Sequence, residues 1–383
     1  MAARLSSPGV VVGSFAEFGL LPSLQASLVE QGLVTPTEIQ SRTIPALVSG
    51  RSVVGVAETG SGKTLSYALP VLQLTKSLED EGTPVTVAGQ PRALVIVPTR
   101  ELGEQVAKVF KTFTHTTRLR VRSVLGGTTM EIARRGLNGP LEVLIATPGR
   151  LIQLLDQRAV SLADLRFIVL DEADQLLDLG FQPDVVRIVE GCPATRQLAL
   201  FSATVSPAVE TLIGRLFADP VVIKSTGSHR IVASLTTINQ TVRDGKRFEL
   251  LLPLLSNNTE GGTLIFANTR EQCDKIAKQL DEAGHPCVIY RGEMSKVERR
   301  ANLKSFRDGE ISVLVSTDLG ARGLDVESVG RVINYHLPHK LENYLHRVGR
   351  TARAGRPGVV VNFVTERDER LVAQFGQIQP PRR

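Results

Sequence analysis

The fold of the N-terminal half is decided by the stretch Ser52-Val53-Val54-Gly55-Val56-Ala57-Glu58-Thr59-Gly60-Ser61-Gly62-Lys63-Thr64. Its first five residues predict a buried strand, and the residues after it follow a helical pattern. Glycines between a strand and a helix let backbone N–H groups face a phosphate. The stretch therefore predicts a phosphate-binding loop, with Ala57 where this motif usually has its first glycine. A chance glycine-rich turn is the alternative, which the flanking strand and helix disfavour.

In such a loop each residue type has a defined task. Gly60, Ser61 and Gly62 would cradle the phosphates, while Lys63 reaches the β- and γ-phosphate oxygens. The Thr64 hydroxyl would bind Mg²⁺. The loop therefore predicts a nucleotide-phosphate site with Mg²⁺.

A second acidic element, Asp171-Glu172-Ala173-Asp174, follows the apolar run 167–170. A carboxylate at the end of a strand beside a phosphate loop is placed to hold Mg²⁺, partly through water, and its neighbour can activate water. Taken alone, acidic residues at a helix start more often complement the helix dipole. Because a phosphate loop lies upstream, we expect Lys63, Asp171 and Glu172 to be catalytic, with Thr64 and Asp171 as the Mg²⁺ ligands.

Apolar, strand-like runs recur outward from these motifs, separated by helix-like stretches. They cover residues 52–57, 93–97, 143–146, 167–170 and 197–201 in the first half and 263–267, 287–290, 312–315, 331–334 and 359–364 in the second. Continuous apolar strands are typical of parallel sheets covered by helices on both faces. The sequence therefore predicts an α/β fold with two tandem domains, residues 1–224 and 236–370, joined by a linker at 225–235 and followed by a short tail at 371–383. A cleft is expected between them, because ligands bind at the carboxyl ends of strands in such sheets.

Composition limits the class of protein. Of the 383 residues, 42% are hydrophobic and 22% are charged, which is typical of a globular protein in water. The longest apolar runs are strand-sized and far shorter than a membrane span. Cys192, Cys273 and Cys287 are scattered without a CxxC pair, so we expect ordinary thiols in a reducing compartment and a cytoplasmic protein without membrane contact.

The formal charge of +6 is unevenly distributed. Residues 1–226 hold 21 Lys and Arg against 21 Asp and Glu, whereas residues 227–383 hold 24 against 18. A basic half indicates a polyanionic partner. The absence of Trp and an aromatic content of 4% disfavour a base-stacking platform, so a nucleic acid would be held through its backbone.

On these motifs the chain resembles the DEAD-box family of RNA helicases, whose name residues 171–174 spell out. About a dozen motifs follow the family's order between residues 15 and 364. The resemblance implies two tandem RecA-like domains and an ATP-dependent RNA helicase. Such an enzyme couples RNA-stimulated ATP hydrolysis to local duplex unwinding or to remodelling of RNA–protein complexes.

The resemblance also implies roles for residues of the first half. Phe15 and Gln40 match the element that recognises adenine, and a glutamine amide can both donate to and accept from the adenine edge. For Gln40 the alternative is a surface residue that caps a turn. Ser202 and Thr204 match the element that couples hydrolysis to strand separation. The residues matching RNA-binding motifs are Thr99, Arg100, Gly127, Thr147 and Arg150 in the first half and Arg270, Gly292 and Thr317 in the second.

In the second half the resemblance completes an ATP site. Gly323 and Asp325 would reach the nucleotide, and Arg350 and Arg353 would act as arginine fingers on the γ-phosphate. Arg347 would couple the domains by contacts across the cleft. The alternative for these arginines is a solvated basic helix face, which is common for Arg at three-residue spacing.

Two other functions stay open at this point. One is a DNA-directed helicase or translocase of the same superfamily, which the Gln40 element and the Asp171–Asp174 spelling disfavour. The other is an ATP-gated RNA clamp that scaffolds partners without needing turnover. Intact Glu172, Arg350 and Arg353 favour turnover.

Overall fold

The computed structural model describes residues 13–58, 60–225, 235–256, 259–292, 294–321, 329–339, 341–352, 357–369 and 371–373. The chain divides into two compact units, Met1–Ser228 and His229–Arg383, hereafter the first and second domains. The division falls within the expected linker, 225–235, whose residues 226–234 lie outside the described part.

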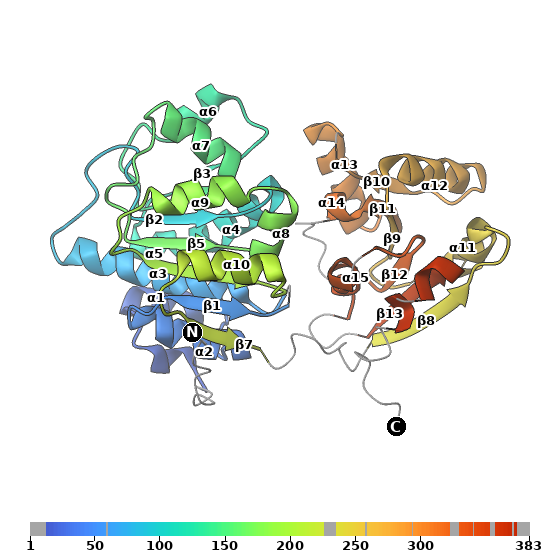
Figure 1. Cartoon of the computed structure of the whole chain (residues 1–383), viewed down its shortest axis with the longest axis horizontal. Coiled ribbons are helices and arrows are strands. Elements are labelled where there is room, and N and C mark those ends of the chain that lie inside the picture. The colour runs from blue at the N-terminus through green and yellow to red at the C-terminus, as the bar shows by residue number, and fades with distance from the viewer. Residues whose placement is uncertain are drawn as a thin grey trace. The chain divides into compact units, whose positions relative to one another are not determined.

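The first domain is a seven-stranded sheet covered by helices on both faces (Figure 1). Its strands are β1 Val53–Val56, β2 Ala93–Ile96, β3 Val121–Val124, β4 Val143–Ala146, β5 Phe167–Leu170, β6 Gln197–Ser202 and β7 Val221–Lys224. Its helices are η1 Phe15–Phe18, α1 Pro22–Glu30, α2 Glu38–Val48, α3 Lys63–Asp80, α4 Arg100–Thr112, α5 Thr114–Thr117, α6 Met130–Arg135, α7 Pro148–Asp156, α8 Ala173–Asp178, α9 Gln182–Glu190 and α10 Pro207–Leu216.

All pairings in this sheet are parallel, in the order β3-β4-β2-β5-β6-β1-β7. Successive residues of a strand point to opposite faces, so β5 contributes Phe167 and Val169 to one core and Ile168 and Leu170 to the other. Helices α1 to α5 cover the first face, and α6 to α10 cover the second. Because both faces are buried, the strands read as continuous apolar runs.

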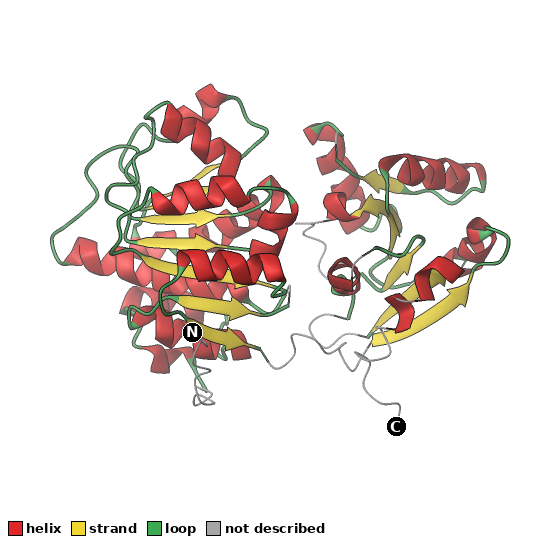
Figure 2. Ribbon diagram, viewed as in Figure 1, coloured by secondary structure: helices red, strands yellow, loops and turns green. Residues whose placement is uncertain are grey.

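The second domain is a smaller sheet of the same kind, which Figure 2 shows with its strands in yellow and its helices in red. Its strands are β8 Leu235–Thr241, β9 Thr263–Ala267, β10 Val288–Tyr290, β11 Val313–Thr317, β12 Arg331–Asn334 and β13 Gly358–Val364. Its helices are α11 Arg247–Leu255, α12 Arg270–Glu282, α13 Lys296–Arg307, α14 Asp318–Ala321, α15 Leu341–Val348 and η2 Glu366–Asp368.

This sheet is also parallel throughout, in the order β10-β11-β9-β12-β13-β8. Helices α11 and α12 pack on one face through Leu251 and Ile276, and α13 and α15 pack on the other through Phe306 and Tyr344. Leu371 also packs against the core of the second face, so the domain continues past the predicted start of the tail at residue 371.

All ten predicted strands are present, which confirms the α/β fold with parallel sheets. Three further strands, β3, β7 and β8, were missed, and all three lie at sheet edges. An edge strand is only partly covered, so it need not be apolar throughout: β3 exposes Arg122 and Ser123, and β8 exposes most of its residues. Strands β3 and β8 therefore lack the continuous apolar run on which the prediction depended, and the apolar run of β7 covers only residues 221–223.

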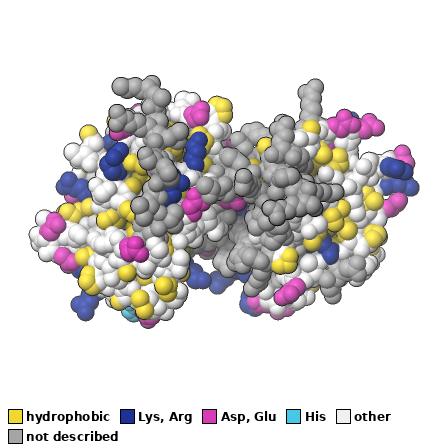
Figure 3. Space-filling model, turned by 90° about the horizontal axis from the view of Figure 1, so that it is seen from below, with side chains coloured by type: hydrophobic (Ala, Val, Ile, Leu, Met, Phe, Trp, Pro, Cys, Tyr) yellow, Lys and Arg dark blue, Asp and Glu magenta, His cyan; other side chains and the backbone are white. Residues whose placement is uncertain are grey.

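No helix in the described part of the chain is long and apolar enough to cross a membrane. On the face of the first domain that Figure 3 shows, basic, acidic and apolar side chains are interspersed. This mixture agrees with the charge balance of that half of the sequence.

Candidate functional site

The phosphate-binding loop runs from the end of β1 to the first turn of α3. Gly60 and Gly62 have left-handed φ angles of 87° and 92°, which side chains rarely adopt. A Cβ at Gly62 would lie 2.4 Å from Nε2 of Gln40, so a larger residue would displace Gln40 as well. The loop thus needs glycine at residue 62 for two independent reasons.

Gln40 holds this loop against helix α2. Its Oε1 accepts a hydrogen bond from the Thr37 backbone N–H at 2.8 Å, which completes a capping box, and its Nε2 donates to the Gly62 carbonyl at 3.1 Å. The Thr37 hydroxyl adds a bond of 2.8 Å to the Ser61 carbonyl. Gln40 does cap a helix, but it is buried rather than at the surface as the alternative required. Its reading of adenine stays a prediction.

Lys63 begins α3 beneath the loop and is only 6% exposed. Its Nζ donates to the Ala57 carbonyl at 2.8 Å, and this hydrogen bond fixes the ammonium at the C-terminal end of β1. Its charge opposes the rise in the pKa of both Glu58 and Asp171, so the ammonium acts on the carboxylates of this site. The loop and the acidic element therefore meet, as the sequence predicted.

Asp171 follows β5 and is fully buried. Burial is the main cause that raises the pKa of its carboxyl to about 6, with the Glu172 carboxylate adding to the rise. Its Oδ2 accepts a hydrogen bond from the Tyr67 hydroxyl at 2.6 Å, and its Oδ1 accepts from the Glu172 backbone N–H at 2.9 Å. Both carboxylate oxygens are thus oriented before any ligand is present.

Glu172 adopts a left-handed backbone conformation, φ 49° and ψ 56°, at the N-cap of α8. Left-handed geometry is unfavourable for a residue other than glycine, and such strain is concentrated at functional sites. The Glu172 side chain is 6% exposed and accepts a hydrogen bond from the Gln175 amide. The backbone conformation of Glu172 and the hydrogen bond from Gln175 together fix the orientation of the Glu172 carboxylate.

Tyr67 is a site residue that the sequence reasoning missed. It lies one turn after Thr64 on α3, and its hydroxyl donates a hydrogen bond of 2.6 Å to Asp171, which with Thr64 is one of the two predicted Mg²⁺ ligands. Burial, followed by the nearby Asp171 carboxylate, raises its pKa well above the usual value, so it stays a hydrogen-bond donor. Its spacing of three residues from Thr64 was the available signal, because residues three apart share a helix face.

We expect Tyr67→Phe to raise the Mg²⁺ concentration needed for half-maximal ATP hydrolysis by about three- to tenfold, since one hydrogen bond to a carboxylate is lost. The ring would keep its packing against Phe110 and Phe201. The measurement is an ATPase titration with Mg²⁺ beside a melting curve. Tyr344→Phe, the same loss of a buried hydroxyl in the second domain, is the matched control. An unchanged Mg²⁺ requirement would leave Tyr67 with a packing role only.

The predicted coupling residues Ser202 and Thr204 meet the acidic element through Asp174. Thr204 donates to Asp174 Oδ2 from both its backbone N–H and its hydroxyl, each at 3.1 Å, and Ser202 Oγ accepts from the Asp174 N–H at 3.3 Å. All three residues are buried. Glu172 caps the start of α8, and Asp174 on α8 is hydrogen-bonded to the segment after β6, so these contacts connect Glu172 to that segment.

The five RNA-contact candidates of the first domain lie at the ends of β2, β3 and β4, which are neighbours in the sheet. Arg100 Nη1 donates to the Gly126 carbonyl at 3.2 Å, and Thr147 Oγ1 accepts from the Gly126 N–H at 3.0 Å. Arg150 Nη2 donates to the Thr128 carbonyl at 2.5 Å. Gly127, with φ 76°, lies between these contacts, and Thr99 caps α4 next to Arg100. All five candidates thus lie at the C-terminal ends of neighbouring strands.

The three candidates of the second domain also follow adjacent strands. Arg270 begins α12 after β9, Gly292 follows β10, and Thr317 ends β11. Thr317 is 6% exposed and its hydroxyl accepts from the Gly320 N–H at 3.1 Å. Neighbouring Arg291 forms a two-bond ion pair with Asp274, at 2.9 and 3.1 Å. That pair positions the loop that carries Gly292.

Arg347 is buried within the second domain. Its guanidinium is 1% exposed and all five N–H donors are used within its own domain. The acceptors are both Asp318 carboxylate oxygens, Asn268 Oδ1, Asn334 Oδ1 and the His336 carbonyl, at 2.5 to 3.1 Å. All five donors are occupied in this way, and the contact of Arg347 across the cleft stays a prediction. Arg347 ties the ends of β9, β11 and β12 together.

The remaining nucleotide candidates are distributed unevenly. Gly323, Asp325 and Arg353 lie outside the described residues. Arg350 is 4% exposed, so a solvated basic face does not describe it, and its carbonyl accepts from the Val329 N–H at 3.0 Å. Phe15 is 4% exposed and packs edge-to-face against Phe18 in the core. Its expected contact with the nucleotide stays a prediction.

Family comparisons agree with this geometry. The family "DEAD/DEAH box helicase" matches residues 37–212, and the family "Helicase conserved C-terminal domain" matches residues 246–355. The chain is 38% identical to the ATP-dependent RNA helicase DBP2 of Saccharomyces cerevisiae, over 95% of the chain and 67% of that protein. It is 36% identical to the ATP-dependent RNA helicase DeaD of Mycobacterium tuberculosis, over 96% of the chain and 63% of that protein.

Other relatives are much longer than this chain. The chain is 36% identical to the human probable ATP-dependent RNA helicase DDX46 over 95% of its length but spans only 35% of that protein. Among solved structures, S. cerevisiae Dbp5 bound to RNA and ADP BeF3 matches with a TM-score of 0.83 and 28% identity, covering 96% of this chain and 93% of that one. A DEAD box protein from Methanococcus jannaschii matches with a TM-score of 0.53 and 30% identity, over 96% and 97%.

Proposed function

The chain belongs to the DEAD-box family, and from this premise we propose that it is an RNA-dependent ATPase and ATP-dependent RNA helicase. The observation that carries the proposal is the joining of the phosphate loop to the acidic element. Helix α3, which begins at Lys63, reaches Asp171 through the Tyr67 hydroxyl. Such a pairing of a phosphate-binding helix with oriented carboxylates suits phosphoryl transfer.

In this proposal the first domain binds ATP and prepares the attacking water. Gln40 reads the adenine edge with the amide hydrogen and lone pair that its protein contacts leave free. Lys63 neutralises β- and γ-phosphate charge, and Glu172 accepts a proton from the water. Arg350 and Arg353 of the second domain would stabilise charge on the γ-phosphate in the transition state.

Mg²⁺ fits the oxygen donors of the site. The Thr64 hydroxyl and the Asp171 carboxylate are hard ligands, and the carboxylate is already oriented by two hydrogen bonds. Among the described residues no three His, Cys, Asp or Glu side chains form a metal cage, and Mg²⁺ typically needs only one or two carboxylates plus phosphates and water. When bound, the ion would neutralise charge on the β- and γ-phosphates.

We propose that RNA is held through its backbone by the two clusters of candidates at the sheet edges. Arg100 and Arg150 supply cations, and Thr147 and Thr317 supply hydroxyls. Phosphate and 2′-OH contacts carry no base sequence, so binding should be largely independent of sequence. Dbp5, a structural neighbour, was solved bound to RNA and ADP BeF3, which supports RNA as the nucleic acid.

We also propose a cytoplasmic location. Burial raises the pKa of Cys192 and Cys287 to about 11 and that of Cys273 to about 12, so all three stay protonated thiols. Unreactive thiols suit a reducing compartment. Fractionation of cells followed by immunodetection checks the location.

The proposed activity is tested by ATP hydrolysis with single-stranded RNA or single-stranded DNA of the same sequence and at the same salt concentration. We expect stimulation by RNA and little by DNA. Equal stimulation would favour the DNA-directed alternative, and ATP-dependent RNA binding without turnover would favour the clamp.

Lys63→Ala should lower turnover in the same assay at least tenfold, equivalent to about 1.4 kcal/mol in the barrier, because the phosphates lose a fixed cation in a buried site. Lys224→Ala, at the exposed end of β7, is the control. A Lys63→Ala variant that keeps more than about a tenth of the wild-type rate would mean that the phosphate loop is misplaced.

A further inference from the structure

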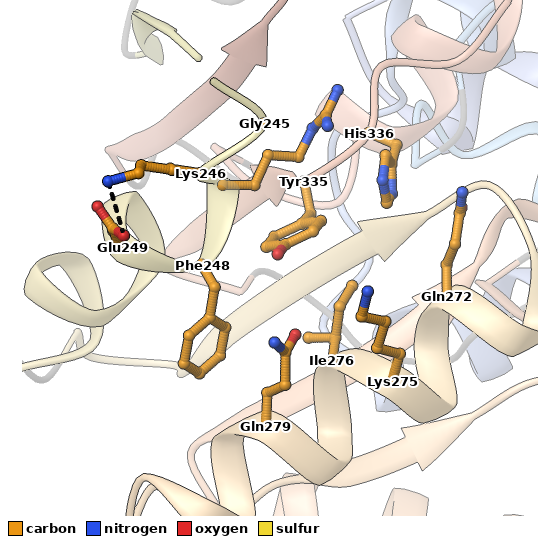
Figure 4. Close-up of a pocket in the computed structure, with 11 residues that line it drawn as sticks. Gly245, Lys246, Phe248, Glu249, Gln272, Lys275, Ile276, Gln279, Tyr335 and His336 are labelled. Carbon is orange, nitrogen blue, oxygen red and sulfur yellow. Dashed lines mark ion pairs between the residues drawn. The ribbon is translucent and has the colours of Figure 1, made fainter. Parts of the chain in front are cut away.

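A pocket of about 470 Å³ opens in the second domain between α11, α12 and the end of β12 (Figure 4). Its lining comprises residues 245–249, one face of α12, and Tyr335 with His336. None of the residues assigned above to ATP or RNA lines it. Its volume is within the range of small-ligand sites, roughly 300 to 1,000 Å³.

The rim of this pocket carries uncompensated positive charge. Lys246 is paired with Glu249 at 3.5 Å. The side chains of Arg247 and Lys275, in contrast, make no ion pair or hydrogen bond with any residue that the structure describes, and Arg247 Nε is buried without a partner. Two cations from different helices thus line the pocket, and the one acid of the lining, Glu249, is paired with Lys246; this charge balance favours an anionic group of the ligand.

The floor of the pocket is largely apolar. Ile276 is 2% exposed and Tyr335 is 7% exposed, and the Tyr335 ring meets the His336 ring edge-on at 5.1 Å. In Figure 4 Ile276, Lys275 and Gln279 project from α12 toward Tyr335, and Phe248 lies at the α11 side. Aromatic and aliphatic walls of this kind accommodate a planar ring.

Polar atoms remain available beside this floor. Burial, together with the charges of Arg247 and Arg347, lowers the pKa of His336 to about 4, so its ring is neutral near pH 7. His336 Nδ1 is buried without a hydrogen-bond partner among the described residues, and the Gln279 amide makes no hydrogen bond with them. A buried polar atom without a partner is costly, and a ligand edge that bonds to it removes that cost.

We propose that this pocket binds one nucleotide unit, with the base against Tyr335 and Phe248 and the phosphate on Arg247 and Lys275. The chemistry is shared by two sources, a free mononucleotide and one nucleotide of an RNA strand. Binding of a nucleotide within an RNA strand rests on the proposed function, whereas binding of a free mononucleotide does not. A planar base suits the apolar, aromatic floor of the pocket, and an anionic phosphate suits its cationic rim.

Titration calorimetry with uridine 5′-monophosphate tests the free nucleotide, and variants of the pocket separate binding there from binding at the ATP site. We expect binding to the wild-type protein and at least tenfold weaker binding to Arg247→Gln/Lys275→Gln. Lys278→Gln is the matched control, since Lys278 lies on α12 outside the pocket and pairs with Glu282 at 3.8 Å. Binding that is unchanged in the double variant would overturn the assignment. The two single variants replace the double variant if its melting curve shows misfolding.

Photocrosslinking tests the RNA strand. Single-stranded RNA containing 5-iodouridine is irradiated on the protein, and crosslinked peptides are mapped by mass spectrometry. Crosslinks at Phe248 or Tyr335 that disappear in the double variant would support an RNA nucleotide, and uridine monophosphate binding without them would support a free one. If neither the crosslinks nor uridine monophosphate binding is observed while RNA-stimulated ATP hydrolysis is normal, the pocket proposal is overturned. Uridine monophosphate binding without RNA-stimulated hydrolysis would instead count against the proposed function alone.

Discussion

Replacing Arg350 with alanine is expected to lower the rate of ATP hydrolysis by about 10³-fold or more, the order associated with arginine fingers. ATP affinity should fall far less, because in the proposed site Gln40, Lys63 and Thr64 of the first domain would still hold the nucleotide. Arg350→Lys should rescue the rate poorly, since an ammonium cannot reproduce the planar, two-bond contact of a guanidinium with phosphate oxygens.

The measurement for Arg350 is single-turnover ATP hydrolysis at saturating RNA, beside a melting curve because the side chain is buried. Arg243→Ala, at an exposed position after β8 in the same domain, is the control. If Arg350 only attracted RNA as a general positive charge, turnover would stay near normal and added salt would mimic the variant. A near-normal rate in a folded variant would therefore refute its role in the ATP site.

Glu172→Gln is expected to lower hydrolysis by about 10² to 10⁴-fold while ATP-dependent RNA binding persists. An amide keeps the shape of the carboxylate but cannot accept a proton from the attacking water. Its carbonyl oxygen can still accept the hydrogen bond from Gln175, so the strained turn at the start of α8 should be preserved.

Two assays on one preparation test Glu172→Gln: single-turnover hydrolysis, and RNA retention with and without ATP. Glu190→Gln, at an exposed ion pair with Arg215 in the same domain, makes the same chemical change away from the site. Loss of ATP-dependent RNA retention together with turnover would contradict the proposal, because Glu172 would then be needed for binding rather than for chemistry.

The sequence by itself determined the elements whose signals are local. Buried parallel strands must be apolar throughout, so ten of them could be read directly from runs such as 167–170 and 263–267. The phosphate loop was equally readable, because left-handed φ angles at Gly60 and Gly62 demand glycine and the flanking strand and helix are local features. The edge strands β3 and β8 were missed because partial cover tolerates polar residues, and edge strand β7 was missed because its apolar run is short.

The tertiary structure alone decided which donor meets which acceptor. Tyr67 and Asp171 are 104 residues apart in the chain and reach each other only because α3 packs on the sheet that carries β5. Arg347 belongs to a basic motif for which a solvated helix face was an alternative. In the fold, acceptors that follow β9, β11 and β12 surround its guanidinium. A sequence pattern encodes burial and periodicity, whereas the saturation of a guanidinium depends on loops that only the folded sheet brings together.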